Sequence, residues 1–182
     1  MGNMVTFTRP DGKTVQGYLA EPTAPQSTSN APAVVVIQEW WGLNDQIRGV
    51  ADRFAAAGFT ALVPDLYRGK STVEAEEAHH LMSGLNFGDA AAQDVRGAVQ
   101  FLKGRRIGSG KVGVTGFCMG GALTLLGATQ TPELDAAAVW YGCPPLDYID
   151  ASKIKAPLLG HWATQDEFFK IDVVDGLDRK SV

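Results

Sequence analysis

The stretch Gly116-Phe117-Cys118-Met119-Gly120, followed at once by Gly121, decides how this chain folds. It joins a strand-like run over Lys111–Thr115 to a helix-like run over Ala122–Gln130. Glycines on both sides of a reactive side chain allow a tight, strained turn from strand to helix, because they carry no Cβ atom. The pattern predicts that the turn presents the Cys118 thiol as a nucleophile. The alternative is a glycine turn that holds a buried cysteine.

The residue after Cys118 is placed to stabilise negative charge. Met119 would open the helix with its backbone N–H group, and free N–H groups at the start of a helix attract anions. An oxyanion that develops on a carbonyl substrate at Cys118 would therefore meet this N–H group.

Composition describes an ordinary globular protein of one domain. The chain has 182 residues, 45% of them hydrophobic and 20% charged, with a net charge of −4. It lacks a basic run, which argues against nucleic acid or an anionic membrane as a partner. The longest apolar run, Ala33–Ile37, is too short to span a bilayer, and no signal peptide is recognised. We therefore expect a cytoplasmic protein in which Cys118 and Cys143 are free thiols.

Strands and helices alternate along the chain after an N-terminal hairpin. The hairpin is predicted from two alternating runs around Asp11-Gly12, and Glu21–Ala31 is expected as a surface loop. The alternation favours a mostly parallel sheet with helices on both faces, an α/β fold. Strands are predicted over Met4–Thr8, Thr14–Ala20, Ala33–Ile37, Phe59–Val63, Lys111–Thr115, Ala136–Tyr141 and Ala156–His161, and helices over Gln46–Ala57, Thr72–Met82, Ala90–Leu102, Gly121–Gln130 and from Ile171 to Leu177.

Three weaker motifs lack the context that their chemistry needs. Gly108–Gly113 matches a dinucleotide-binding glycine pattern, but it precedes a strand instead of following one. Gly69-Lys70-Ser71 resembles the end of a phosphate-binding loop, but the first glycine of that loop would fall on Pro64. His79 and His80 are adjacent on a helix and cannot both face one metal, and the other His and Cys residues lack metal-ligand spacing. These motifs therefore predict neither a nucleotide-binding loop nor a metal site.

Acidic residues follow two other predicted strands. Glu39, just past a buried strand and before Trp40-Trp41-Gly42, could hold or tune the thiol, or could be a capping or surface acid. The backbone N–H of Trp40 would be a second oxyanion donor. Asp166, past the last predicted strand, could orient a catalytic imidazole, or cap the next helix. Because sites in such sheets lie at the carboxyl ends of the strands, we expect these residues to converge on Cys118.

Four segments together resemble the dienelactone hydrolase family of α/β-hydrolases. They are Gln38–Gly42, Val63–Tyr67, Gly113–Gly121 and Gly160–Asp166, and the similarity runs in order from about Val5 to Phe169. The resemblance implies an α/β-hydrolase fold that hydrolyses esters or lactones with a Cys-His-Asp triad and no cofactor.

The same resemblance assigns roles to individual residues. It implies that Cys118 is the nucleophile, that Asp166 is the acid of the triad and that Glu39 contacts the resting thiol. It also implies that Trp40 and Met119 supply the oxyanion hole. Independently of the resemblance, the aromatic residues suggest an apolar wall of a substrate pocket that includes Trp41, Phe117 and His79, although the aromatic residues could simply be core.

The triad histidine has no counterpart in this chain. In the order nucleophile, acid, histidine it should follow Asp166, but none of the sixteen residues after Asp166 is histidine. The single domain over residues 1–182 is therefore expected to be incomplete at its C-terminal end, without the last strand and helix. It would be either a truncated hydrolase or a protein with a native end and a different function. His161 could replace the base, but its place in the strand before the acid favours a structural or pocket-lining role.

Taken together, the sequence favours a hydrolase of a small ester or lactone that is acylated on Cys118 and impaired in deacylation, as a monomer or homodimer. Dienelactone itself is a poor candidate substrate, because Ser71–Gly84 has no Arg or Lys to meet its carboxylate. Acyl or thioester transfer is an alternative reaction. From another class, the chain could be a non-catalytic fragment or pseudoenzyme that binds a ligand or partner, since an exposed sheet edge favours pairing with another chain.

Overall fold

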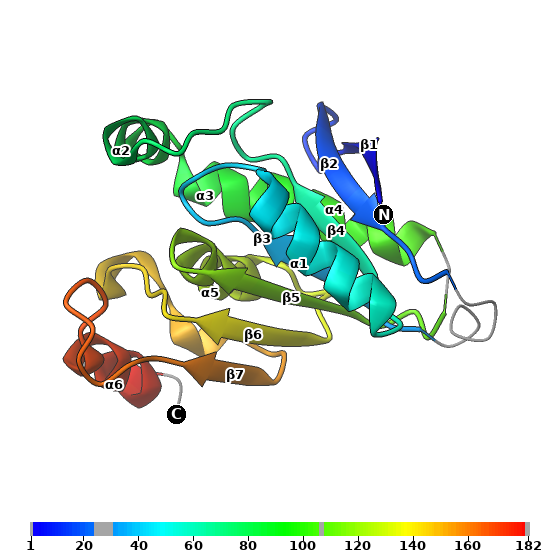
Figure 1. The fold of residues 1–182 in the computed structure, drawn as a ribbon. Helices are drawn as coiled ribbons and strands as arrows, with labels where there is room; N and C mark the ends of the chain where they lie inside the picture. Colours follow the sequence, from blue (N-terminus) through cyan, green and yellow to red (C-terminus); the bar gives the residue numbers. More distant parts are fainter. Residues whose placement is uncertain (1, 24–30, 106–107, 181–182) are drawn as a thin grey trace.

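The structure is a computed structural model that describes residues 2–23, 31–105 and 108–180. The loop expected over Glu21–Ala31 falls largely on residues 24–30, which lie outside the described residues. In the described part, the chain forms one mixed sheet with helices packed against both faces (Figure 1). The predicted α/β architecture is confirmed.

Seven strands form the sheet in the described residues: β1 (Asn3–Thr8), β2 (Thr14–Ala20), β3 (Ala33–Ile37), β4 (Thr60–Pro64), β5 (Val112–Phe117), β6 (Ala136–Trp140) and β7 (Leu158–His161). Their spatial order is β1-β2-β4-β3-β5-β6-β7. The first two strands form the predicted antiparallel hairpin, and β2 is also antiparallel to β4. The remaining neighbours are parallel, as expected for the continuous apolar runs of β3 and β4, which are buried on both faces.

The helices lie close to their predicted positions, between the parallel strands or, for α6, after the last of them. They are α1 (Asp45–Ala56), α2 (Ala75–Ser83), α3 (Phe87–Asp89), α4 (Arg96–Gly104), α5 (Met119–Gln130) and α6 (Ile171–Lys180), with short 3₁₀ turns at η2 (Leu146–Tyr148) and η3 (Ala151–Lys153). Helix α2 begins three residues later than predicted. The Thr72 hydroxyl accepts the N–H of Glu74 at 3.0 Å, which holds this segment in a turn before the helix.

The helix predicted over Ala90–Leu102 is longer and less regular than expected. It starts at Phe87, because the Asn86 side chain caps α3 by accepting the N–H of Asp89 at 2.9 Å. A π-helical turn, η1 (Ala90–Val95), then joins α3 to α4. Sequence periodicity did not predict this turn. It places Asp94, which is almost completely buried, within ion-pair distance of Arg9 and Arg68.

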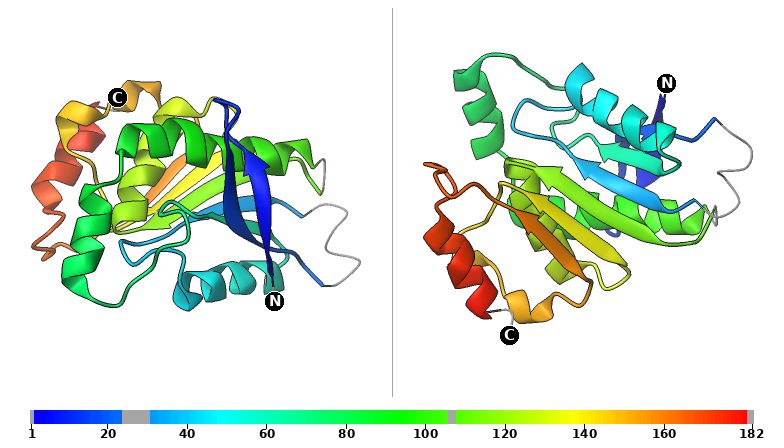
Figure 2. Two further views of the ribbon diagram at one scale, coloured as in Figure 1. Left: turned by 90° about the horizontal axis from the view of Figure 1, so that it is seen from above. Right: turned by 60° about the horizontal axis from the view of Figure 1, so that its bottom comes forward.

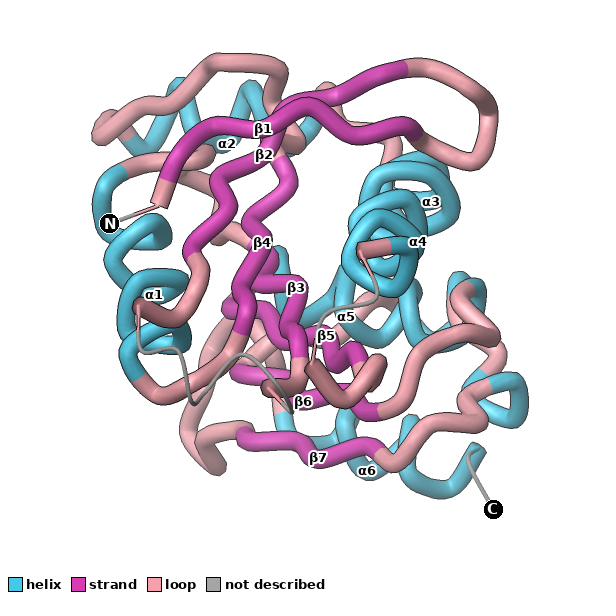
Figure 3. Tube along the Cα trace, turned by 90° about the vertical axis from the view of Figure 1, so that its right-hand side faces the viewer, coloured by secondary structure: helices cyan, strands magenta, loops and turns pink. Residues whose placement is uncertain are grey.

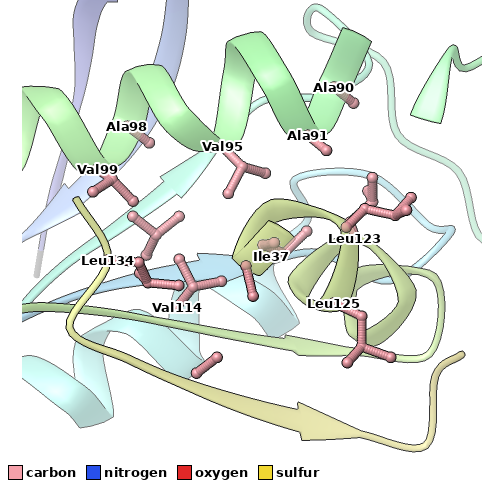
Figure 4. Packing of buried hydrophobic residues seen from close by; sticks show 14 of the residues in the cluster. Ile37, Ala90, Ala91, Val95, Ala98, Val99, Val114, Leu123, Leu125 and Leu134 are labelled. Atoms are coloured by element: carbon pink, nitrogen blue, oxygen red, sulfur yellow. The ribbon is translucent and has the colours of Figure 1, made fainter. Parts of the chain in front are cut away.

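Buried side chains form one cluster on each face of the sheet. The smaller cluster lies under α1 and includes Ile47 and Val50. The larger cluster contains α5, of which ten of the twelve residues are buried; a helix that is apolar on all sides is expected only where it is enclosed. Figure 4 shows Val95 of η1, Leu123 of α5 and Ile37 of β3 meeting in this cluster.

The helices cover the two faces unevenly. Figure 3 shows α1 on one side of the sheet and α3, α4 and α5 on the other. On the α1 side, none of the described helices lies across β6 and β7 (Figures 1 and 2). Alternate residues of a strand point to opposite faces: Ala137 and Val139 are buried in the cluster around α5, whereas Trp140 stays 37% exposed and Leu159 of β7 is 58% exposed.

The carboxyl ends of the parallel strands lie at the end of the sheet where α2 and α6 are drawn (Figure 1). The turn into α5 starts there. None of the helices in the described residues has the length and apolar character that crossing a membrane requires.

Asp135 connects elements at the opposite, amino-terminal end of the strands. It accepts hydrogen bonds from Lys103 at 2.5 Å, from the Val112 N–H at 2.8 Å and from Lys111 at 3.0 Å. Partial burial of the carboxyl acts in the opposite direction, but these hydrogen bonds dominate and lower the pKa of Asp135 to about 2.

We expect Asp135 to contribute stability that is present above about pH 4 and is lost as the pH falls through about 2, because its folded-state pKa lies below that of the unfolded chain. Asp135→Asn should lower the free energy of unfolding at neutral pH and flatten its acid dependence. Urea unfolding at pH 7 and pH 3 measures both effects. A difference between the two proteins that is the same at both pH values would contradict this role.

Candidate active site

The turn between β5 and α5 has the strained geometry that the sequence predicted. Cys118 lies between the two elements with φ 54° and ψ −115°, in a region that residues other than glycine rarely adopt. Its N–H donates to the carbonyl of Trp140 in β6 at 3.0 Å, and its carbonyl accepts the N–H of Gly121 at 2.9 Å. The neighbouring strand and the helix together hold the strained residue in place.

Close packing around the turn explains its glycines. A Cβ on Gly116 would lie 2.1 Å from the carbonyl oxygen of Gly120, and a Cβ on Gly120 would lie 2.5 Å from that of Ile37 in β3. After β6, a Cβ on Gly142 would lie 2.1 Å from the carbonyl oxygen of Cys118. The backbones of β3, the turn and the end of β6 therefore pack directly against one another.

The half-buried thiol of Cys118 is surrounded by negative charge. Burial raises the pKa of the thiol, and the charges of Glu39 and Asp166 raise it further. The backbone N–H of Met119, which hydrogen-bonds the sulfur, acts in the opposite direction. The structure thus brings both predicted carboxylates close enough to act on Cys118, and it favours a protonated thiol at neutral pH.

Glu39 has a different hydrogen-bond partner from the expected one. The resemblance implied a contact with the resting thiol, but in the described residues the carboxylate of Glu39 accepts a hydrogen bond from the Tyr141 hydroxyl at 3.1 Å. Burial and the Glu39 carboxylate raise the pKa of Tyr141 to about 12, so its hydroxyl remains a donor. Tyr141 also has a positive φ, 38°, directly after β6. Two strained residues, Cys118 and Tyr141, therefore lie at neighbouring strand ends.

Tyr141 and Tyr67 are the contacts that sequence reasoning missed. Tyr67 follows β4, and its buried hydroxyl donates to the sulfur of Met119 at 3.3 Å. Burial and the charge of Cys118 raise the pKa of Tyr67. Each tyrosine lies one to three residues past a strand end, and this position was the available signal. The tertiary arrangement decides which of the residues after the strand ends contributes to the site around the thiol.

The two N–H groups predicted for an oxyanion hole, those of Met119 and Trp40, differ in their surroundings, and their role stays a prediction. Met119 begins α5, and its N–H lies against the Cys118 sulfur. The N–H of Trp40 has no hydrogen-bond acceptor among the described residues. The side chain of Trp40 packs edge-on against Trp41, with ring centroids 5.1 Å apart.

Of the two roles that the sequence left open for Asp166, the described residues show the capping role, and the role in orienting an imidazole stays a prediction. Its carboxylate accepts the N–H groups of Phe168 at 2.8 Å and Phe169 at 2.9 Å, so it caps the turn that follows β7. Its charge also raises the pKa of the Cys118 thiol. The cap fixes the carboxylate near the site.

No histidine of this chain is hydrogen-bonded to Cys118 or Asp166, and all three histidines lie in the described residues. His79 and His80 are exposed on α2. His161 stacks on Trp140, with ring centroids 4.2 Å apart and an interplanar angle of 18°. This stacking favours a structural role for His161 over a role as the base.

The residues predicted to line a substrate pocket are dispersed. Phe117 stacks on Trp140, with ring centroids 6.1 Å apart, whereas Trp41 contacts Trp40. In the described part of the chain, His79 makes no ring contact with either aromatic residue. A pocket role for Trp41, Phe117 and His79 remains a prediction. In the described residues there is no group of three or more His, Cys, Asp or Glu side chains that could hold a metal ion.

Comparison with known proteins gives a consistent result. The model of the dienelactone hydrolase family matches residues 15–181. Protein usf of Aquifex pyrophilus is 41% identical, covering 99% of this chain and 78% of the relative. An Aquifex aeolicus protein provisionally named a carboxymethylenebutenolidase is 38% identical, covering 96% of this chain and 76% of the relative. A crystal structure from Klebsiella pneumoniae, provisionally named a dienelactone hydrolase, covers all of this chain with 80% of its own, with a TM-score of 0.78 and 26% identity.

Gly120→Ala should destabilise the protein by about 1–3 kcal/mol, because the new methyl group would meet the backbone of β3 and force the turn apart. Gly104→Ala, near the end of α4, is the matched control. A Cβ there meets no atom within 4 Å, so this variant should be neutral or slightly stabilising. Urea unfolding of the two variants compares them directly. Equal stabilities would contradict the tight backbone contact.

The pH dependence of Cys118 alkylation should report the neighbouring carboxylate. Glu39→Gln removes a negative charge that raises the pKa of the thiol, so iodoacetamide labelling of Cys118 should begin at lower pH than in the unaltered protein. Peptide mass spectrometry across pH measures the shift. Tyr141→Phe is the control, because it removes the hydrogen bond and leaves the charge. An unchanged profile in Glu39→Gln would show that the carboxylate does not act on the thiol.

Proposed function

Because this chain belongs to the dienelactone hydrolase family, whose members hydrolyse carboxylic esters and lactones, we propose that it reacts with a small ester or lactone through an acyl-cysteine on Cys118. The observation that carries the proposal is the strained position of Cys118 at the start of α5, with the Met119 N–H on its sulfur. A strained residue in such a turn is a common feature of nucleophiles in this type of fold.

In the acylation step, the Cys118 sulfur attacks the carbonyl carbon of the substrate, and the carbonyl oxygen becomes an oxyanion. The N–H groups of Met119 and Trp40 would donate to this oxyanion, which stabilises the charge as it develops. When the oxyanion collapses, the carbon–oxygen bond to the alcohol breaks. The alcohol oxygen takes up the proton that the thiol lost, which leaves a thioester on Cys118.

The surroundings of the thiol make proton removal the difficult part of this step. Burial, Glu39 and Asp166 all favour the protonated thiol, so attack needs a base. We propose that Glu39 serves as that base, and Tyr141 would hold its carboxylate in position through the 3.1 Å hydrogen bond. Negative charge at the site also disfavours anionic substrates, which agrees with the lack of Arg and Lys over Ser71–Gly84.

Deacylation should be the impaired half of the reaction. A water molecule must lose a proton while it attacks the thioester, and this step normally relies on a histidine. We propose that Asp166 is the acid that would orient such a histidine, and that Trp41, Phe117 and His79 would flank the substrate. With no histidine at Cys118 in the described residues, the acyl group would persist on the sulfur.

A second candidate function rests on the lack of a histidine at Cys118 in the described residues. Without a general base the chain could bind an ester-like ligand or a partner without turnover, as a pseudoenzyme. In this case an activated acyl ester would label Cys118 no faster than it labels an ordinary buried thiol.

The test is intact-mass and peptide mass spectrometry after incubation with an activated acyl ester, with release of the acid followed in parallel. Acyl transfer should occur on Cys118 and be lost in Cys118→Ala. Cys143 is the internal control for nonspecific acylation, because burial raises its pKa to about 11 and it lies outside the turn. The expected result is a Cys118 thioester that forms faster than it is hydrolysed.

The outcomes separate the candidates. Steady turnover that is lost in Cys118→Ala would show that another group serves as the base in deacylation, and His161→Ala would then be measured. Equal or absent labelling of Cys118 and Cys143 would reject the hydrolase proposal for this chain and favour the binding function.

A further inference from the structure

A cluster of charged side chains lies beside the β1–β2 hairpin, at the opposite side of the sheet from β7. Its centre is Asp94 of η1, which is 1% exposed. The Nη2 of Arg68 lies 2.9 Å from both carboxylate oxygens of Asp94, and the Nη1 of Arg9 lies 3.2 Å from one of them. Arg9 is itself buried and also pairs with Asp11 and Asp89. The cluster therefore connects the hairpin, η1 and the chain that follows β4.

Stability alone does not explain a buried cluster of this kind. Removing ionic groups from water carries a cost that their attraction often fails to offset, and well-packed apolar side chains often stabilise a protein as much. Burial raises the pKa of Asp94, and the two guanidinium groups act against that effect. The carboxylate is also presented by a π-helical turn, a rare conformation that frequently occurs near functional sites. The cluster is better explained by what it holds in place.

Arg68 connects the cluster to the β4 segment, which we define as residues 65–72. Its Nη1 donates to the carbonyl of Asp65 at 2.7 Å, and its backbone has a positive φ of 55°. The buried carboxylate of Asp65 accepts the N–H of Tyr67 at 3.2 Å and the N–H of Gly69 at 2.5 Å. A left-handed arginine persists only where its surroundings hold it. The ion pair with the η1 carboxylate holds Arg68 from outside the segment.

The β4 segment contacts one of the two proposed oxyanion donors through Tyr67. The buried hydroxyl of Tyr67 donates to the sulfur of Met119 at 3.3 Å, and the N–H of Met119 lies against the sulfur of Cys118. A displacement of Tyr67 would therefore release the side chain of the first residue of α5. Because Tyr67 directly precedes Arg68, the ion pair acts within one residue of this contact.

The β4 segment also supports the loop after β3, which carries the other proposed donor, the N–H of Trp40. The buried side chain of Gln38 accepts the N–H of Leu66 at 3.4 Å. Further along both loops, Gly42 and Ser71 form an antiparallel bridge. Since Gln38 and Gly42 lie on either side of Trp40, the β4 segment holds the loop at both ends.

We propose that Arg68 and Asp94 are positioning residues for the reaction at Cys118. Their ion pair fixes the β4 segment, and this segment sets where the N–H groups of Met119 and Trp40 lie. Arg68 and Asp94 themselves act without touching the substrate. The inference rests on the proposed acylation of Cys118, because an oxyanion forms there only when a carbonyl compound reacts.

Two reactions of the same thiol test the positioning role. Acylation of Cys118 by an activated ester passes through an oxyanion, whereas alkylation by iodoacetamide displaces iodide and forms none. The ratio of the two rates therefore reports the oxyanion hole and corrects for changes in the thiolate population. Arg68→Gln should lower this ratio about 10- to 100-fold, because a small displacement of an oxyanion donor has an effect of that size. Peptide mass spectrometry measures both rates.

Arg96→Gln is the matched control. Arg96 begins α4 and pairs at 2.9 Å with Glu133, which precedes β6 and lies away from the Cys118 turn. The side chains of Arg68 and Arg96 are 46% and 33% exposed, so both variants remove a partly exposed guanidinium from an ion pair. The ratio of acylation to alkylation should stay unchanged in Arg96→Gln.

Asp94→Asn removes the same ion pair from the other side and should also lower the ratio. Circular dichroism verifies that each variant folds. Arg68→Gln is the milder change, because Asp94 keeps its contact with Arg9, and it carries the test if Asp94→Asn does not fold.

Hydrogen exchange separates this inference from the proposed reaction, because it needs no substrate. In Arg68→Gln, amides of the β4 segment and of residues 38–42 should exchange faster than in Arg96→Gln. Faster exchange in a protein that is never acylated on Cys118 would reject the proposed reaction but support the link between the ion pair and the two loops. Exchange that is unchanged in both segments, or a ratio in Arg68→Gln equal to that in Arg96→Gln, would overturn the inference.

Discussion

The close backbone contact around Cys118 is the constraint on which the rest of the structure depends. The turn after β5 lies between the ends of β3 and β6, with no room for side chains at Gly116, Gly120 and Gly142. Helix α5 must therefore start against the sheet and run through the larger cluster of buried residues, which is why it is apolar on all sides. The same close backbone contact also holds Cys118 at its positive φ. It therefore accounts both for the packing of α5 against the sheet and for the position of the thiol.

The site combines two requirements that act against each other. A nucleophilic cysteine needs its thiolate form, whereas burial and two carboxylates keep this thiol protonated. The Met119 N–H offsets only part of that effect. A carboxylate that destabilises the thiolate can still accept its proton while the sulfur attacks, so the same group can suppress reaction at rest and assist it when a substrate is bound. The hydrogen bond from Tyr141 holds the Glu39 carboxylate in position for both of these effects.

Much of the fold was predictable, because the buried strands are continuous apolar runs and the turn at Cys118 has a local glycine signature. The hairpin, the order of strands and helices, and the strand ends that carry Glu39 and Asp166 follow from those patterns. The π-helical turn around Asp94 and the partners of Glu39 and Met119 did not follow. These features depend on hydroxyl and guanidinium groups that come from distant parts of the chain, so they cannot be predicted from the local periodicity of the sequence.

The uneven cover of the sheet has a consequence for how the molecule opens. The central strands are enclosed by α1 on one face and by α4 and α5 on the other, so their amide protons should exchange with solvent only when the whole domain unfolds. Strand β7 has a helical layer on one face only. This strand and α6 therefore form a unit of lower local stability, able to detach while the remaining strands stay folded. The cap made by Asp166 lies within that unit, so local opening would withdraw one of the two carboxylates from Cys118.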